Sequence, residues 1–219
     1  MTATMTRPAT PASATDIDVT LPAQLLWGAA QCAHSDDWKG ALVAVQVVFR
    51  WNDAESVHAT IRSCDGSLAY RAATIAKGSC DALTSSESEP VQVLILAAQL
   101  RKILKTESTI TVARIAGQLR VQGFKMGIRP DAEYLDGCEY PDLDKVWPGA
   151  ADLQCKPGGF IAFSGKYLET IGKVAQRTTD KGILRLFTGS PAQPAVLQTD
   201  RHQGLDHPAF LLMPVVCRD

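Results

Sequence analysis

The sequence predicts an α+β fold in which one unit, a strand followed by a helix and three more strands, is used three times. Three observations support this prediction. Several short segments alternate apolar and polar residues, which is typical of half-buried strands. Three other segments carry apolar residues at helical spacing. The order of these elements then recurs along the chain, and an internal repeat of this size usually decides the fold.

The bulk composition is that of a globular protein. The 219 residues are 46% hydrophobic and 21% charged, and the formal net charge is −1. This balance excludes a domain that holds nucleic acid by its overall charge, but a local basic face remains compatible with it. No segment reaches the ~18 apolar residues of a membrane helix, and no secretion signal is recognised. We therefore expect a cytoplasmic protein without a membrane partner.

Cysteine and histidine spacing argues against a metal centre. The six cysteines are scattered without a Cys-x-x-Cys pair, and the four histidines offer only isolated ligand pairs. A structural zinc site needs four ligands at close, regular spacing. We expect free, mostly buried thiols and no cofactor.

The first unit is expected to follow a disordered tail, residues 1–15, which is rich in Thr, Ala and Pro. The alternation over residues 17–21 predicts a strand. Pro22 stands where a helix N-terminus tolerates proline, and apolar residues at helical spacing extend this helix to His34.

Three strands complete the first unit. The Val-rich segment 41–51 predicts the first of them, and residues 56–62 and 68–75 predict the other two. Asp65 and Gly66 lie between the last two segments and predict a hairpin turn.

The second unit follows a loop rich in Ser and Glu, residues 79–90. A strand is predicted over residues 91–95, and Leu96, Leu100, Ile103 and Leu104 define the apolar face of a helix. Three short strands are then predicted, with a tight turn at residues 116–117: 109–115, 118–123 and 125–129.

The third unit follows a linker. Its predicted elements are a strand over residues 160–163, a helix with a stripe formed by Tyr167, Leu168, Ile171, Val174 and Ala175, and strands over 183–188, 195–198 and 210–216. The expected organisation is therefore a full domain of two units over residues 16–130, a linker over 131–157 and a half domain over 158–219.

Five short motifs occur on these elements. They are Val19-Thr20-Leu21-Pro22, Cys64-Asp65-Gly66-Ser67-Leu68-Ala69, Tyr140-Pro141-Asp142 with Val146 and Pro148, Lys166-Tyr167-Leu168, and Met213-Pro214-Val215. In type and order they resemble the DNA sliding clamps, specifically the β subunit of bacterial DNA polymerase III. The resemblance covers the family's middle domain and the second half of its last domain, about one and a half domains. It implies a DNA clamp-like fold.

The resemblance implies binding rather than bond chemistry. A clamp holds double-stranded DNA topologically and without sequence specificity, with helices lining the hole. The matching DNA-facing residues are Arg101, Lys102, Lys105, Lys166, Lys173 and Arg177. Lys166, Lys173 and Arg177 are expected on one solvated side of their helix. The same residues also fit the ordinary charged faces of amphipathic helices, and the first helix has no Lys or Arg.

The resemblance also implies a pocket for short peptides of DNA polymerases or repair proteins. The matching positions are Gly66, Ser67 and Leu68 at the hairpin, Pro141, Lys145 and Val146 in the linker, and Leu211, Met213, Pro214 and Val215 on the last strand. Met near such a pocket suits varied ligands because it is flexible and polarisable. The alternative is that the last strand is simply an edge of the core.

Two functional hypotheses remain open. In one, the protein encircles DNA as a clamp. A bacterial clamp subunit has three domains of two units each, so three units leave a sheet edge without a partner and predict either a homo-oligomer or an irregular pairing of the third unit with the first two. In the other, a clamp-fold interaction module acts through peptide or clamp binding without encircling DNA. No nucleophile, phosphate-loop or metalloprotease motif supports an enzyme.

Overall fold

The computed structural model describes residues 16–35, 37–103, 106–115, 118–123, 129–130, 139–148, 162–179, 182–188, 194–199 and 206–214. The expected tail over residues 1–15, the predicted turn at 116–117, Lys105, Val215 and most of the linker lie outside these ranges.

The described residues form three α-helices, two 3₁₀ helices and one sheet of eleven strands. In chain order these are β1 (Ile17–Pro22), α1 (Ala23–Gln31), η1 (Asp37–Val43), β2 (Ala44–Trp51), β3 (Ser56–Cys64), β4 (Leu68–Cys80), β5 (Val91–Leu96), α2 (Ala97–Leu100), β6 (Thr109–Ile115), β7 (Gln118–Gly123), β8 (Arg129–Pro130), η3 (Leu143–Lys145), α3 (Gly165–Thr178), β9 (Leu184–Phe187), β10 (Ala195–Thr199) and β11 (Asp206–Leu212).

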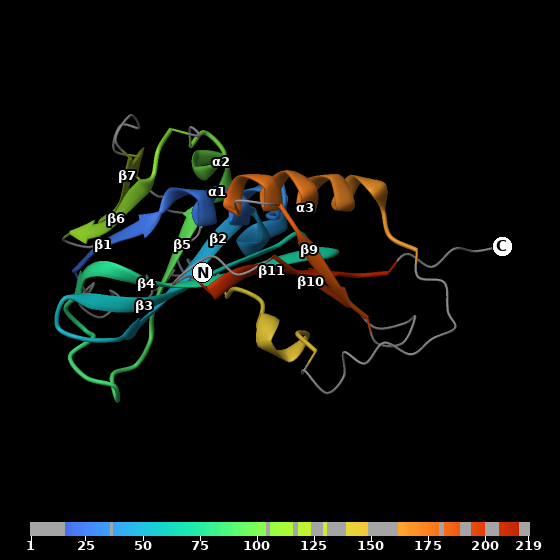
Figure 1. Cartoon of the computed structure of the whole chain (residues 1–219). Helices are drawn as coiled ribbons and strands as arrows, with labels where there is room; N and C mark the ends of the chain where they lie inside the picture. Colours follow the sequence, from blue (N-terminus) through green and yellow to red (C-terminus); the bar gives the residue numbers. More distant parts are fainter. Residues whose placement is uncertain are drawn as a thin grey trace, which may run out of the picture.

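The three α-helices lie on one face of the sheet and η3 lies on the other (Figure 1). The main path of the sheet is β5-β2-β3-β4-β1-β6-β7-β8, and β11, β10 and β9 branch from β4. The long strand β4 makes this branch possible. It pairs with β3 on one side, and on the other side its beginning pairs with β11 and its end with β1.

Units 1 (β1 to β4) and 2 (β5 to β8) are joined by a reciprocal exchange of strands. The first strand of unit 1, β1, pairs with β6 of unit 2, and the first strand of unit 2, β5, pairs with β2 of unit 1. The registers correspond as well, since Leu21 lies opposite Ile110 and Ile95 lies opposite Val45. The two units therefore complete one another across an approximate two-fold axis.

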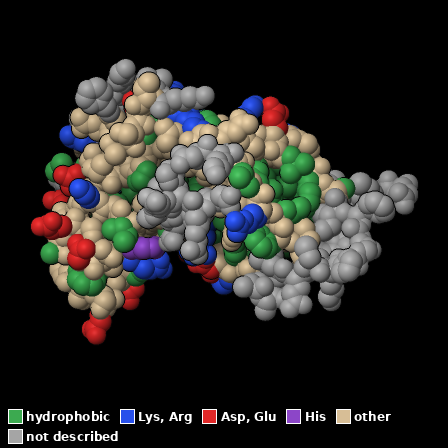
Figure 2. Space-filling model, in the orientation of Figure 1, with side chains coloured by type: hydrophobic (Ala, Val, Ile, Leu, Met, Phe, Trp, Pro, Cys, Tyr) green, Lys and Arg blue, Asp and Glu red, His purple; other side chains and the backbone are tan. Residues whose placement is uncertain are grey.

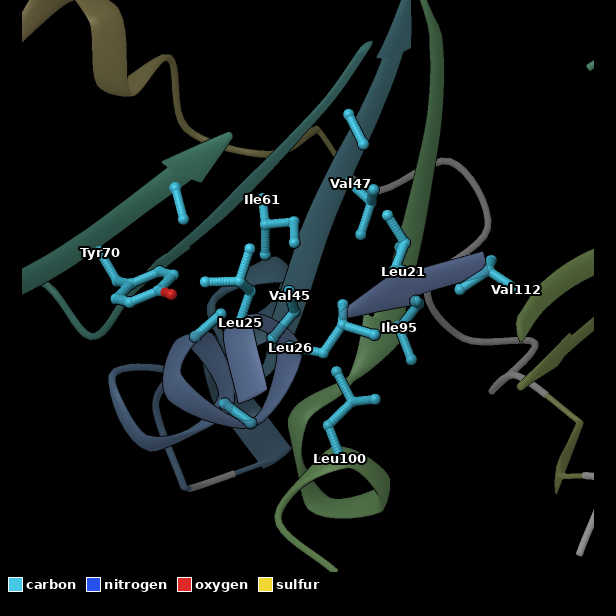
Figure 3. Packing of buried hydrophobic residues seen from close by; sticks show 14 of the residues in the cluster. Leu21, Leu25, Leu26, Val45, Val47, Ile61, Tyr70, Ile95, Leu100 and Val112 are labelled. Atoms are coloured by element: carbon cyan, nitrogen blue, oxygen red, sulfur yellow. The ribbon is translucent and has the colours of Figure 1, made fainter. Parts of the chain in front are cut away.

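The main core lies between the sheet and the helices. Leu26 of α1 and Leu100 of α2 are fully buried in it and lie close together with Ile95 (Figure 3). Burial of each such side chain contributes about 1.5–3 kcal/mol. The repeat of strand, helix and strands predicts this α+β architecture correctly for units 1 and 2.

Several element bounds differ from the prediction. Residues 41–43 belong to η1, in which Gly40 has a φ of 57°, so β2 begins only at Ala44. The predicted second helix is a single turn, because the amides of Lys102 and Ile103 bond three residues back in 3₁₀ fashion.

The ends of α1 and β11 also lie earlier than predicted. Helix α1 ends at Gln31, and β11 ends at Leu212 instead of continuing to residue 216. Pro214 has no N–H to donate to a sheet, which explains an early strand end. Ala162 and Phe163, predicted as part of a strand, are described outside any strand.

Candidate peptide-binding surface and helix face

A row of apolar residues crosses five strands on the sheet face opposite the helices. The registers place Phe187 opposite Val196, Val196 opposite Leu211, Leu211 opposite Ala69, and Ala69 opposite Cys64. Alternation along each strand turns the neighbouring residues, such as Phe210, toward the helices. Strand β11 therefore contributes side chains to both faces of the sheet.

The linker covers this row. Leu143 of η3 is buried against Ala69, Val196 and Leu211, and Tyr140 and Trp147 pack at the margin of the same cluster. The turn of η3 is stabilised locally, because the carboxylate of Asp142 accepts a hydrogen bond from the amide of Asp144 at 3.2 Å. We call the row together with residues 140–147 the linker surface.

Asp144 attaches the linker to the sheet. Its carboxylate accepts hydrogen bonds from Arg62 at 2.8 Å and Arg71 at 3.2 Å. These two arginines are directly opposite one another on β3 and β4. Like charges in that position repel, so the carboxylate between them removes an unfavourable pair while it anchors η3.

The β3–β4 hairpin meets the end of β11 beside this surface. Asp65 accepts hydrogen bonds from the amides of Ser67 and Leu68, both at 2.8 Å. Gly66 has a φ of 98°, a conformation that favours glycine. The amide of Met213 then donates to the carbonyl of Ser67 at 3.0 Å, which brings the chain end to the hairpin.

The structure brings together most positions predicted for the peptide pocket. The hairpin, the linker and the end of β11 are adjacent, and their exposed apolar side chains include Val146 at 54% and Met213 at 42%. Lys145 is exposed and pairs with Asp142 at 3.4 Å. Leu68 differs, because its side chain is buried in the core on the helix side. Val215 lies outside the described residues.

Sequence reasoning did not assign several members of the linker surface. They are Cys64, Ala69, Tyr140, Trp147, Phe187 and Val196. The aromatic residues of the linker motif gave a usable signal, whereas Phe187 and Val196 are identified only by the strand register. Burial raises the pKa values of the Cys64 thiol and of the Tyr140 hydroxyl, so both groups stay neutral at pH 7.

Two of the arginines predicted to face DNA form hydrogen bonds with other parts of the protein. The guanidinium of Arg101 donates to the carbonyls of Ala30, Ala33 and His34 at 2.9, 2.7 and 3.3 Å. These groups lie at the C-terminal end of α1, where a cation and hydrogen-bond donors are favourable. Arg101 therefore closes the end of α1.

Arg177 of α3 acts at the other end of α1. It donates to the side chain of Gln24 at 2.5 Å and to the carbonyl of Ile103 at 2.9 Å. Its guanidinium lies 3.9 Å from the ring centre of Trp27. It is half-buried, so the prediction of Lys166, Lys173 and Arg177 on one solvated side is wrong for Arg177.

The remaining described positions of that set are exposed. Lys102 and Lys166 are open to solvent, and Lys173 forms an ion pair with Glu169 one turn before it. Lys105 lies outside the described residues. The three α-helices and residues 101–103 together hold five basic residues and one acidic residue. The rest of the chain holds 17 basic and 22 acidic residues. The helix face is therefore positive in a chain of net charge −1.

A polar cavity of about 430 Å³ lies on the helix side, between the end of α1 and the start of α3. Its lining includes Gln31, His34, Asp65, Arg101 and Lys166. Within the described ranges we find no group of His, Cys, Asp or Glu that could hold a metal ion. None of the described helices has the length and apolar character needed to cross a membrane.

Comparison with solved structures identifies the fold. The β subunit of DNA polymerase III from Thermotoga maritima is 14% identical, with a TM-score of 0.58 over 100% of this chain and 70% of its own. A sliding clamp from Bartonella birtlesii bound to griselimycin is 12% identical, with a TM-score of 0.59 over 96% of this chain and 68% of its own. The Helicobacter pylori β clamp bound to a DNA ligase peptide is 13% identical, with a TM-score of 0.56 over 95% of this chain and 68% of its own.

Comparisons with protein-family models and with curated protein sequences gave no match. The fold is thus shared with proteins whose sequences are only 12–14% identical to this chain. The strand exchange of units 1 and 2, the helices on one face and the structural matches agree. This chain has the fold of the bacterial DNA sliding clamps and matches about two thirds of the length of their subunits.

Proposed function

We propose that this protein is a sliding-clamp-like factor that holds DNA topologically and recruits polymerases or repair proteins through short peptides. The observation that carries the proposal is the linker surface. It is assembled from three separate parts of the chain, residues 64–69, residues 140–147 and strands β9 to β11, and it has exposed apolar side chains at Val146 and, directly after β11, at Met213.

The chemistry of this surface suits a short apolar peptide. Met213 is flexible and polarisable, and the neighbouring aromatic residues supply large contact areas. The Helicobacter pylori clamp of the same fold was solved with a DNA ligase peptide. By analogy, the partners of this chain would present short apolar motifs, and the role of the protein is binding rather than catalysis.

A topological hold on DNA requires more than one copy. Three repeat units supply a quarter of the twelve in a clamp ring, so four copies would be needed. The positive helix face supports a DNA-facing role for that side, since phosphate contacts from Lys and Arg dominate non-specific DNA affinity. Lys102 and Lys166 are the described residues best placed for it.

Peptide binding can be tested by fluorescence anisotropy with a labelled clamp-type peptide containing Gln and Leu. Met213→Asp should weaken binding by roughly tenfold or more, because a charge would enter an apolar contact. Met213 is 42% exposed, so the variant should remain folded.

Ile115→Asp is the matched control, since Ile115 is 55% exposed at the end of β6. It should leave the peptide affinity unchanged. Failure of the parent chain to bind the peptide, or an equal loss in both variants, would contradict the recruiting role.

One observation favours the interaction module that does not encircle DNA. Arg101 and Arg177 are engaged in contacts between helices, and α1 has no basic residue. Retention on circular DNA separates the two functions. Encirclement predicts slow loss from a closed circle and rapid loss once the circle is cut, whereas equal rates would leave only the module.

A further inference from the structure

The third unit exposes a helix position that is buried in the other two. Leu26, Leu100 and Leu168 are each the fourth residue of their helix. Leu26 and Leu100 are 0% exposed and lie close together between α1 and α2, as Figure 3 shows. Leu168 is 44% exposed. The position that joins unit 1 to unit 2 is therefore open to solvent on α3.

The strands show the same contrast. Val45 of β2 and Ile110 of β6 face the helices and are 0% exposed, because each strand is covered by the first strand of the other unit. On β9, the helix-facing Leu186 is 51% exposed. Among the described residues only β10 pairs with β9, whereas β2 and β6 each pair on both sides.

We call three exposed apolar residues of α3, of β9 and of the position just before β9 the unit 3 flank: Leu168, Leu186 and Ile183. Figure 2 shows hydrophobic side chains gathered around α3 and the strands that follow it, while acidic side chains gather at the far end of the molecule. An apolar helix flank beside an open strand edge is an arrangement that proteins normally cover.

We propose that a second copy of this chain covers the unit 3 flank, so that two third units complete one domain across a two-fold axis. Units 1 and 2 carry the argument. There, equivalent residues meet one another, Leu26 with Leu100, which makes this type of surface complementary to itself. A two-fold axis needs a self-complementary patch, and unit 3 has the same patch without an internal partner among the described residues.

The consequence is a composite domain at the centre of a dimer, with unit 1 and unit 2 of each copy on either side. Leu168 of one copy packs against Leu168 of the other, as Leu26 packs near Leu100. The inference rests on the self-association that the proposed function requires, but not on DNA binding or peptide binding.

Light scattering on the intact chain tests the interface. The parent chain should have at least twice the monomer mass, and Leu168→Asp or Leu186→Asp should halve that mass or raise the dissociation constant roughly tenfold or more. Ile75→Asp is the matched control, because Ile75 is 62% exposed on β4 and lies outside the unit 3 flank. Circular dichroism checks that each variant is folded, as the exposure of the replaced side chains predicts.

Cross-linking tests the two-fold axis. Oxidation of Leu168→Cys should give a disulfide between two copies at residue 168, identified by peptide mapping, and Ile75→Cys should give none. A monomeric parent chain, an oligomer unchanged by both Asp variants, or an oligomer without the link between residues 168 would each overturn the proposal. A dimer that forms as expected but does not stay on circular DNA would contradict the encirclement of DNA and would leave the dimer interface supported.

Discussion

Asp144 connects the linker to the sheet through two arginines that would otherwise repel each other. Arg62 has a side chain only 9% exposed, whereas Asp144 is about half exposed. A carboxylate hydrogen-bonded to a buried guanidinium contributes more than an isolated surface pair, because the arginine would be left without its partner. Asp144 therefore helps to hold η3 over the apolar row, together with the buried side chain of Leu143.

Asp144→Asn should lower the free energy of unfolding by about 1 kcal/mol, since the charge between Arg62 and Arg71 is lost while the shape is kept. Chemical denaturation measures the change. Glu87→Gln is the control, because Glu87 is exposed in the loop after β4. Equal stability of the two variants would show that the ion pair does not hold the linker.

Gly28 shows how closely two helices approach. A Cβ at this position would lie 2.9 Å from Val174 of α3 and 3.3 Å from the ring of Tyr70. Gly28→Ala should therefore lower the free energy of unfolding by about 1–3 kcal/mol through overpacking. Gly172→Ala is the matched control, since a Cβ there meets nothing within 4 Å and alanine favours the helix by up to about 1 kcal/mol. Destabilisation by both substitutions would contradict the packing argument.

At the scale of elements, local chemistry decided how well the sequence predicted the fold. Strands β6 and β7 have the predicted bounds, because both segments alternate apolar and polar residues. The Asp65-Gly66 turn was likewise predictable from its residues. The exchange of β1 and β5 between units was not, since strand pairing over such distances leaves no local pattern.

The candidate site was likewise predictable from the sequence only in part. The motifs at 64–69, 140–148 and 213–215 pointed to the peptide pocket, and the described parts of all three are adjacent. The side chain of Leu68 points to the other face, which follows from a register that sequence does not show. The polar side of a helix also looks the same whether it meets solvent or another helix, so the sequence did not show the helix contacts of Arg101 and Arg177.

Arg177→Lys separates a DNA-facing role of Arg177 from its role in helix contacts, because lysine keeps the positive charge but lacks the planar guanidinium group. We expect the free energy of unfolding to fall by about 1–2 kcal/mol, since lysine cannot reproduce the contacts with Gln24, Ile103 and Trp27 together. Denaturation followed by Trp fluorescence measures the loss. Lys173→Arg serves as a control on the same helix, and a fully stable Arg177→Lys would return Arg177 to the group of DNA-facing candidates.

For the whole molecule, β4 is the element on which both parts of the sheet depend. Its beginning holds β11 and its end holds β1, so the third unit is joined to the first along one continuous strand. Within the described part of the chain, the sheet has free edges at β5, β8 and β9.

Hydrogen exchange distinguishes these edges. If two third units complete one domain, the amides of β9 should exchange more slowly as protein concentration rises, because the dimer covers that edge. Strand β5 provides the internal control: among the described residues it pairs only with β2, and it lies outside the proposed interface. Its exchange should not depend on concentration. Exchange in β9 that stays constant across the dimer transition, or protection that grows at β5 instead, would place the contact between copies elsewhere.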